Sequence, residues 1–517
     1  MSLRCLKPKC LTQASGMLRY AAVALLMVVG VQHVEAQKLI TYEAGMGTRD
    51  KVDPDVWILY KKVEAHHEGM VLYADSALLN TQRNDFTAFR NIKIILTDTT
   101  VVYGQRLYYD GNTKVLNIWG DTVRLIDGGT VLKSNNLVYD RNTETATYTE
   151  WGHAVNGRRT LDSRQGHYNS AFDEFYIYGD VVLADTSSSL YTDTLIYNTK
   201  TERADIVSAT RIYSDSAVVY SEKGFYYSAS RYAVSHRASR VENGAKTLEC
   251  DTLHYSEETN HARAIGHVCI VDTVNNTVCR GGYGENNQEQ HYSYVTDSAL
   301  VRYVDKDDTL YMHADTIYLY SDENNKLCAV HAYHKAKLYR DDVQGMSDSV
   351  YYSVVDSLIV LYYSPVAWYG EQQCTADTIS IFLDSGAVKL AKLDGHCFTV
   401  EKVDSLKFNQ VSGARGVVHF DKGSPLYADV FENVKTVYHI TEEPEKGIQM
   451  LIGVNVGTGK DMRIYFNDKS PDRVVTYGAP DMYTYPLSKL PADQRLLPGF
   501  AWYSDRRPAR WQDVFKW

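Results

Sequence analysis

Proline is scarce through most of this chain. Only Pro365 lies between Pro54 and Pro425, whereas seven of the eleven prolines come after residue 440. A proline has no backbone N–H to donate and is confined to the edges and ends of sheets. The long proline-poor part is therefore suited to continuous strands, and the proline-rich end predicts irregular structure.

Helical periodicity is missing as well. Apolar residues do not return at spacings of three and four, which excludes an array of amphipathic helices. The aromatic residues are mostly tyrosine, with 41 Tyr against 13 Phe, and tyrosine favours strands that keep one face partly in water. We expect an all-β protein.

Long apolar runs are lacking too. The one extended apolar segment, AAVALLMVVGV at residues 21–31, is too short to span a bilayer. Four basic residues precede it, and Val34 and Ala36 stand at the −3 and −1 positions of a cleavage site before Gln37. Residues 1–36 are therefore predicted to be a cleaved signal peptide, with an uncleaved anchor as the alternative.

After residue 36, the chain has no run of basic residues and no cysteine motif. Cleavage after Ala36 leaves 50 basic and 63 acidic residues, a balance that does not fit a nucleic-acid-binding protein. Six cysteines remain, without a CxxC motif or a tight spacing pattern. We expect them to be small buried side chains rather than a disulfide framework.

Signatures of catalysis are also missing. The chain has no G-x-S-x-G or H-E-x-x-H motif, and GVNVGTGKDM at 453–462 has Asp461 where a phosphate-binding loop has Ser or Thr. His331 and His334 lie three apart in a predicted strand, so they point to opposite faces and are poorly placed to share a metal ion. We expect no enzymatic activity, no cofactor and no metal.

What the chain does contain is an internal repeat of about 29 residues. Asp followed by Thr or Ser and an apolar residue recurs, for example at Asp193, Asp251 and Asp315. Gly followed by Asp or His and then Val recurs as well, at Gly179 and Gly266. Together with periodic tyrosines, these markers indicate a repeat array. The tyrosines are Tyr109, Tyr139, Tyr168, Tyr197, Tyr226 and Tyr255.

Each repeat is predicted to contain two strands, the first typified by TDTLIYN at 192–198. Polar turns such as DGNT at 110–113 and NTKT at 198–201 separate them. The sequence therefore predicts an elongated, all-β repeat array over residues 37–430. A β continuation and an irregular tail rich in proline and aromatic residues are predicted over 431–517.

Alternation of side chains along a strand puts one apolar set on a single face. These faces are predicted to form a continuous apolar seam along the array, and nine residues are candidates for lining a groove there. The candidates are Leu137, Tyr139, Val181, Leu195, Tyr197, Leu253, Tyr255, Val268 and Ile270.

Asp193 does not fit this pattern, because it shares the parity of the apolar Leu195. Either Asp193 and its counterparts lie in water at the mouth of a fold, or a β-bulge reverses the register beside them. The sequence leaves both explanations open.

The repeated motifs resemble those of OstA/LptA-type proteins of lipopolysaccharide transport. YADSALLN at 73–80, HADTIYLY at 313–320 and TADTISIF at 375–382 are typical of that family. LLPGFAWYSDRRPARWQDVF at 496–515 resembles the end of the large OstA-like proteins of Bacteroidetes. The chain departs from the short periplasmic members in its size.

The resemblance implies a β-jellyroll, or folded-sheet groove, that shields acyl chains while sugars stay in water. It implies a periplasmic lipid-binding conduit that carries lipopolysaccharide or a related glycolipid to the outer membrane. Such a protein would be either free in the periplasm or associated with that membrane. Partners would be Lpt-type envelope transport proteins, joined through end strands by strand addition.

The main alternative is a structural or adhesive β-solenoid whose seam is closed by its own side chains. For the aromatic end of the chain, folding back onto the array and docking on a partner both stay open.

Overall fold

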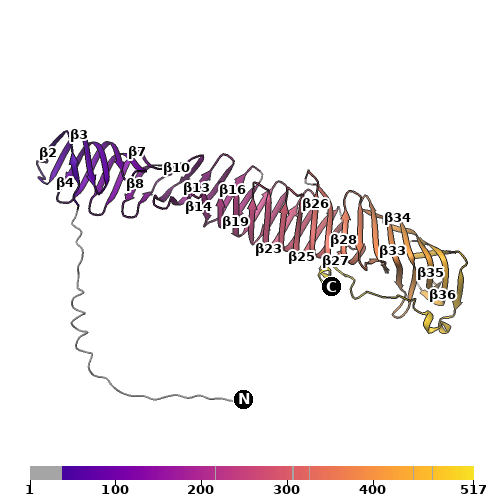
Figure 1. Ribbon diagram of the computed structural model, residues 1–517. Coiled ribbons are helices and arrows are strands. Elements are labelled where there is room, and N and C mark those ends of the chain that lie inside the picture. Colours follow the sequence, from indigo (N-terminus) through magenta and orange to yellow (C-terminus); the bar gives the residue numbers. More distant parts are fainter. Residues whose placement is uncertain (1–37, 216, 306–307, 325, 446–447, 468–469) are drawn as a thin grey trace, which may run out of the picture. The chain divides into compact units, whose positions relative to one another are not determined.

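The computed structural model describes residues 38–517 except 216, 306–307, 325, 446–447 and 468–469 (Figure 1). The predicted signal peptide, residues 1–36, lies outside the described residues. Within the described part, the regular structure is antiparallel β-strand with three short 3-10 helices near the C-terminus. The prediction of an all-β array is confirmed.

The chain forms two units. The described residues of unit 1 are 38–126 and 135–143, and those of unit 2 are 127–134 and 144–517. The strands that lie wholly or partly in unit 1 are β1 (Thr41–Glu43), β2 (Met46–Arg49), β3 (Val56–His67), β4 (Met70–Asn80), β5 (Asp85–Ile95), β6 (Thr100–Asp110), β7 (Val115–Asp127) and β8 (Thr130–Asp140).

Unit 2 holds the remaining elements. Its earlier strands are β9 (Thr145–Tyr148), β10 (Gly152–Asn156), β11 (Arg159–Ser163), β12 (Gln165–Asn169), β13 (Glu174–Ala184), β14 (Ser188–Asn198), β15 (Arg203–Ile206), β16 (Thr210–Ser214), β17 (Val218–Ser221), β18 (Lys223–Tyr227), β19 (Tyr232–Arg237), β20 (Ser239–Asn243), β21 (Lys246–Cys250), β22 (Thr252–Ser256), β23 (His261–Asp272) and β24 (Thr277–Asn287).

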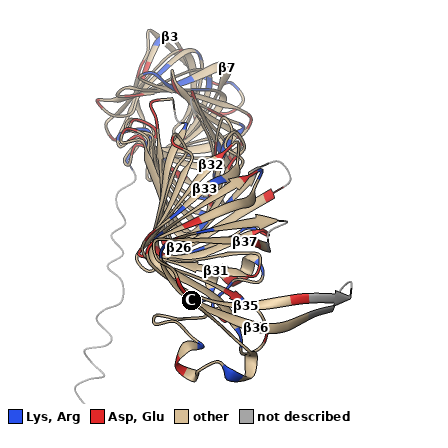
Figure 2. Cartoon of the chain, turned by 90° about the vertical axis from the view of Figure 1, so that its right-hand side faces the viewer, with Lys and Arg blue, Asp and Glu red and all other residues tan. Residues whose placement is uncertain are grey.

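The later elements of unit 2 are β25 (Tyr292–Asp305), β26 (Asp308–Ser321), β27 (Leu327–Tyr339), β28 (Val343–Ser353), β29 (Leu358–Tyr362), β30 (Val366–Tyr369), β31 (Gln372–Thr375), β32 (Thr378–Asp384), β33 (Ala387–Lys402), β34 (Phe408–Asp421), β35 (Ser424–Glu445), β36 (Ile448–Asn467), β37 (Ser470–Tyr477), β38 (Asp481–Tyr485), η1 (Leu487–Lys489), η2 (Ala492–Gln494) and η3 (Trp511–Phe515). The longest strands, β35 and β36, run out beyond their neighbours as a hairpin (Figure 2).

The repeat consists of two bent strands, as predicted. β13 pairs with β14 over almost its full length. One end of β14 then pairs with β15 and the other with β16, so these two short strands are the halves of one strand divided at its bend. Turns of polar residues join successive strands close to the predicted positions, as at 110–113 and 198–201.

A bulge marks each bend and settles the position of Asp193. In the pairing of β13 with β14, Gly179 and Asp180 lie opposite the single residue Asp193. Gly179 and Asp180 adopt φ values of +80° and +50°, in the left-handed region. The bulge reverses the parity, and Asp193 is exposed. Both explanations offered for Asp193 are therefore correct: the residue is exposed to water, and a bulge reverses the register beside it.

The Gly-His marker at Gly266 forms the same bulge at the bend of a later repeat. Gly266 has a φ of +76°, and a Cβ placed on it would lie 2.2 Å from Oδ2 of Asp251. His267 Nδ1 lies 2.8 Å from the same carboxylate oxygen. The two sequence markers are thus neighbours in space, and glycine is needed because the aspartate fills the place of a side chain.

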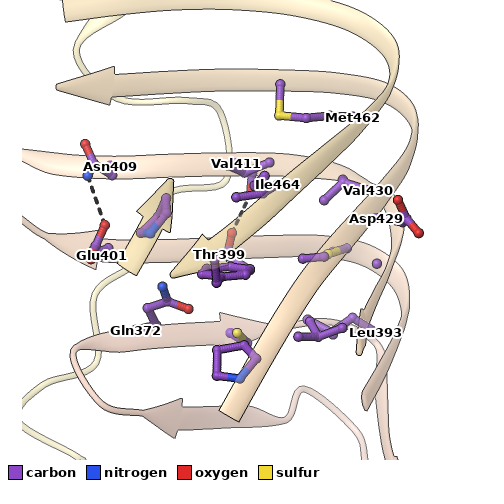
Figure 3. Close-up of a pocket in the computed structure, with 18 of the residues that line it drawn as sticks. Gln372, Leu393, Thr399, Glu401, Asn409, Val411, Asp429, Val430, Met462 and Ile464 are labelled. Atoms are coloured by element: carbon purple, nitrogen blue, oxygen red, sulfur yellow. Dashed lines mark hydrogen bonds between the residues drawn. The ribbon is translucent and has the colours of Figure 1, made fainter. Parts of the chain in front are cut away.

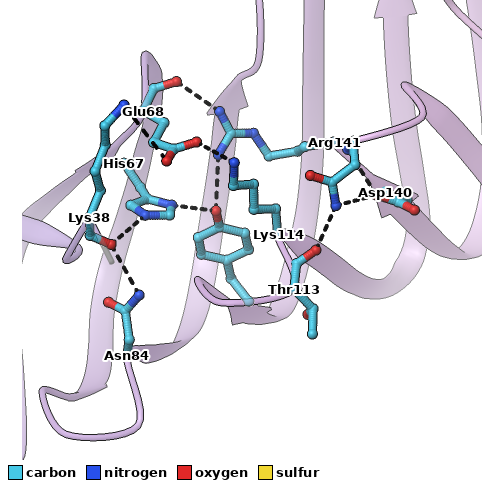
Figure 4. Close-up of polar contacts among 10 residues, drawn as sticks. Lys38, His67, Glu68, Asn84, Thr113, Lys114, Asp140 and Arg141 are labelled. Carbon is cyan, nitrogen blue, oxygen red and sulfur yellow. Dashed lines mark hydrogen bonds and ion pairs between the residues drawn. The ribbon is translucent and has the colours of Figure 1, made fainter. Parts of the chain in front are cut away.

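A polar network holds the turns of unit 1 around one of the periodic tyrosines (Figure 4). The Tyr109 hydroxyl lies 2.6 Å from His67 Nδ1 and accepts a hydrogen bond of 2.9 Å from Arg141. Glu68 pairs with Lys114 at 2.7 Å, and this bond lowers the pKa of the Glu68 carboxyl. The buried tyrosine ring thus belongs to the core while its hydroxyl fixes the turns.

Candidate functional site

A cavity with a volume of about 570 Å³ lies within unit 2, between Val343 and Met482 in the sequence. Its walls come from strands of the β28 and β30–β38 segments. We call it the C-terminal cavity. No residue of the proline-rich end after Tyr485 is among those that line it.

Side-chain volume explains why the space is found here. Small residues such as Ala391, Gly416 and Ala428 stand in the walls of the C-terminal cavity. Among the largest fully buried side chains of the described residues, by contrast, every Tyr and Phe lies at or before Tyr197. The one large buried ring of the later repeats in that set is Trp368, which borders the cavity and packs against Tyr503 of the C-terminal end. Large rings fill the interior of the earlier repeats, whereas small side chains cannot meet across the later ones.

One side of the C-terminal cavity is apolar. Leu393, Val430, Met462 and Ile464 lie on this side, and Val430 and Met462 pack in one cluster with Val434 (Figure 3). Hydrocarbon placed against such a surface gains about 0.8 kcal/mol for each methylene that leaves water. This side of the cavity therefore suits an acyl chain.

Two unpaired cysteines also face the C-terminal cavity. Cys374 and Cys397 are among its lining residues, and neither forms a disulfide. Burial raises the pKa of the Cys374 thiol to about 12. Both side chains are therefore neutral and add to the apolar surface.

The other side of the C-terminal cavity carries a polar row, made of Gln372, Glu401, Asn409, Tyr438 and Asn455. Glu401 is the cross-strand partner of Gln372 on one neighbouring strand and of Asn409 on the other. Tyr438 and Asn455 are likewise cross-strand partners. Figure 3 shows Gln372, Glu401 and Asn409 away from the apolar side.

Hydrogen bonds order this polar row. Asn409 Nδ2 donates to Glu401 Oε2 at 3.0 Å, and its Oδ1 accepts from the backbone N–H of His439 at 2.8 Å. Asn455 Nδ2 donates to Oγ1 of Thr484 at 3.2 Å. Burial, helped by the charge of Glu401, raises the pKa of the Tyr438 hydroxyl. The row is therefore a fixed set of neutral groups with one carboxylate.

The C-terminal tail, residues 486–517, folds back along unit 2 on the outer face of these strands (Figure 1). It follows one cross-strand row of residues, in which each is the partner of the next. We call this set the tail row. It consists of Gln344, Trp368, Gln373, Val400, Gln410 and Val437.

Glutamines of the tail row hold the tail by its backbone. Gln410 donates to the carbonyl of Arg495 at 2.9 Å and accepts from the N–H of Leu497 at 2.8 Å. Gln373 makes the same pair of bonds with Ala501 and Tyr503, both at 2.8 Å. The two buried amides thus recognise the same backbone pattern at two points, six residues apart on the tail.

Aromatic contacts complete the attachment of the tail. Tyr503 packs on the cluster that contains Trp368, and Trp511 stacks on Tyr311 with 5.1 Å between ring centroids. Phe515 lies 4.6 Å from the ring of His313. Of the two alternatives for the aromatic end, the tail therefore folds back onto the array.

The nine residues predicted to line a groove lie in the interior of the earlier repeats. All are buried except Ile270, which is half-buried, and none of the nine lines the C-terminal cavity. Tyr197 borders a space of only about 10 Å³. Contact of these nine residues with lipid stays a prediction.

The polar row and the tail row were not found from the sequence. One signal was present: Gln344 and Gln373 each precede the aspartate of an Asp-Ser or Asp-Thr marker by four residues. A glutamine repeated at a fixed place in the repeat indicates a common partner, but not which segment that partner is.

Two features are absent from the part of the chain that the structure describes. No group of three or more His, Cys, Asp or Glu residues there could hold a metal ion. No helix in the same residues is long and apolar enough to cross a membrane.

Comparisons with known proteins bear on the earlier repeats. The family model described as OstA-like protein matches residues 37–193 and 175–251. None of the curated proteins matches the chain. Among solved structures, the chain is similar to LptH from Pseudomonas aeruginosa, titled the LptA-homologous periplasmic component of the conserved lipopolysaccharide transport device. The identity is 13%, over 23% of this chain and 84% of that chain, with a TM-score of 0.20.

The matched residues contain the Asp-Thr and Gly-Asp markers, whereas the C-terminal cavity lies beyond them. The resemblance inferred from the repeated motifs is therefore confirmed for residues 37–251, the part of the chain that the OstA-like family model matches.

Proposed function

We propose that this protein is a non-enzymatic lipid carrier of the periplasm. It shields the acyl chains of lipopolysaccharide or a related glycolipid on the way to the outer membrane, and it engages envelope transport proteins through its end strands. The observation that carries the proposal is the C-terminal cavity of about 570 Å³, whose one side is apolar.

Two further facts support this proposal. The OstA-like family model matches residues 37–251, and the resemblance to OstA/LptA-type proteins implies a role in lipopolysaccharide transport. Pocket volumes of roughly 300–1,000 Å³ are typical of small-molecule sites, so the C-terminal cavity has the size of a ligand site rather than of a packing defect. The lipid would therefore bind in the later repeats.

The rival function, a structural or adhesive solenoid, is favoured by one observation in the earlier repeats. Leu195 and Tyr197 are 0% and 1% exposed, and the space beside Tyr197 is about 10 Å³. A filled interior of this kind makes a stiff spacer and leaves no room for an acyl chain. We propose that the earlier repeats supply length and the later ones hold the lipid.

Mass spectrometry of the purified protein tests the proposal. Protein isolated from an envelope that makes lipopolysaccharide is expected to carry co-purified glycolipid. In a variant with Ala391→Trp, the indole would occupy the C-terminal cavity, and the bound glycolipid should fall at least tenfold.

Lys392→Trp is the matched control, because the neighbouring residue of a strand points to the opposite face. The control should retain its lipid. Lipid-free wild-type protein, or equal lipid in the two folded variants, would count against the carrier function and favour the solenoid.

A further inference from the structure

Among the residues that the structure describes, those that line the C-terminal cavity include no cation. Not one of them is Lys, Arg or His, and the only two charged ones are Glu401 and Asp429. Asp429 accepts two hydrogen bonds from Arg463, of 2.6 and 2.8 Å, so its charge is balanced. Glu401 is bonded to the neutral amide of Asn409. The carboxylate of Glu401 therefore sets a negative potential on the polar side.

This potential discriminates between lipid head groups. A phosphate or carboxylate placed beside Glu401 would meet a like charge, and the described lining residues offer no Arg or Lys to bind it. Amide, phenol and carboxylate groups in a row can instead donate to and accept from hydroxyl groups. The polar row is thus complementary to an uncharged, hydroxyl-rich head group.

The size of the C-terminal cavity limits how much of a lipid can enter. The cavity holds about 570 Å³. Sites for small-molecule ligands have volumes of about 300–1,000 Å³, so the cavity has the size of a site for one such ligand. One long chain together with a sugar unit fills this space, and a lipid with many chains would bind with only part of its hydrocarbon inside.

From these observations we propose that the C-terminal cavity selects glycolipids by a neutral saccharide. The sugar would lie against the polar row, one acyl chain would lie against the apolar side, and lipids with a phosphate at that place would be disfavoured. The proposal rests on the proposed function, because it takes the cavity to be the lipid site.

Binding of three amphiphiles with the same twelve-carbon chain tests the selection. The probes are dodecyl maltoside, dodecyl phosphate and dodecyltrimethylammonium, each below its micelle concentration, titrated into the full chain by calorimetry. Dodecyl maltoside is expected to bind at least tenfold more tightly than dodecyl phosphate. In Glu401→Gln, dodecyl phosphate should gain affinity by about the same factor, because the like charge is gone.

Asp421→Asn is the matched control for Glu401→Gln. Asp421 ends the same strand that carries Asn409, is exposed and does not line the C-terminal cavity, so removal of its charge should leave all three affinities unchanged. Asn409→Leu should weaken dodecyl maltoside alone. Thermal melting of each variant shows that it is folded.

The outcomes separate the two proposals. Equal affinity for the three head groups, or tighter binding of dodecyl phosphate, would overturn the saccharide selection and leave the lipid carrier intact. Binding of none of the three probes would overturn both.

Discussion

The side chain of Gln373 holds the backbone of Tyr503, 130 positions further along the chain, through a hydrogen bond of 2.8 Å from the tyrosine N–H. The same amide donates to the carbonyl of Ala501 at 2.8 Å. Gln373 is 1% exposed, so both of its polar atoms depend on the tail for their partners. This pair joins the outer face of the array to the end of the chain.

Replacement of Gln373 by alanine is expected to loosen the tail. Two hydrogen bonds are lost, and two backbone groups of the tail, the carbonyl of Ala501 and the N–H of Tyr503, are left without these partners, at a cost of about 1–3 kcal/mol. Hydrogen exchange at the Tyr503 amide should speed up, and proteolysis after residue 486 should become faster. Gln372→Ala is the control, because Gln372 faces the cavity and not the tail. Unchanged exchange at Tyr503 would contradict the role given to Gln373.

Replacement of Gly266 by alanine should destabilise unit 2 at the bulge where its strand bends. The new Cβ would lie 2.2 Å from Asp251 Oδ2 at a φ of +76°, and strain of this kind costs about 1–3 kcal/mol. Gly128→Ala is the control, because Gly128 also has a positive φ but has no atom within 4 Å of an added Cβ. Urea unfolding should show a larger loss for Gly266→Ala. Equal losses would mean that the contact with Asp251 does not matter.

A photoreactive amino acid distinguishes the two regions as lipid sites. At Val411, which lines the C-terminal cavity, it should crosslink to glycolipid in growing cells. At Tyr197, where the space is about 10 Å³, and at Tyr363, which is 72% exposed, crosslinking should be at least fivefold weaker. Strong crosslinking at Tyr197 would instead support a groove that continues through the earlier repeats.

Acid should weaken unit 2 through its buried histidines. Burial lowers the pKa of His313 and His439 below their ordinary value of 6.5. The unfolded chain therefore binds more protons than the folded chain as the pH falls through about 6.5, and the free energy of unfolding decreases. The urea midpoint should fall between about pH 7.5 and pH 5.5. His439→Gln should reduce this fall, and an equally steep fall in that variant would exclude His439 as a cause.

The markers of the repeat could be interpreted in advance because each acts locally. Asp193 breaks the alternation of its own strand, and Gly179 stands where a left-handed φ is needed opposite it. The polar turns are equally local. The strands, the period and the presence of a bulge or an exposed aspartate could therefore be derived from short stretches of sequence.

The candidate site could not be derived in this way. The sequence pattern treats Leu195 and Leu393 alike, as apolar residues of a strand, but only Leu393 borders an open space. Whether a seam is open depends on the summed volume of side chains that meet from several strands. That sum is a property of the packed interior and not of any single repeat.

The sequence by itself determined the all-β repeat, its period and the resemblance to OstA-like proteins, because hydrogen bonding, alternation and turn formation act between residues close in the chain. Only the tertiary structure decided where the interior is filled and where it is open, and where the tail lies. Those features depend on side-chain volumes and hydrogen-bond partners brought together from residues far apart in the chain, such as Gln373 and Tyr503, which are 130 positions apart.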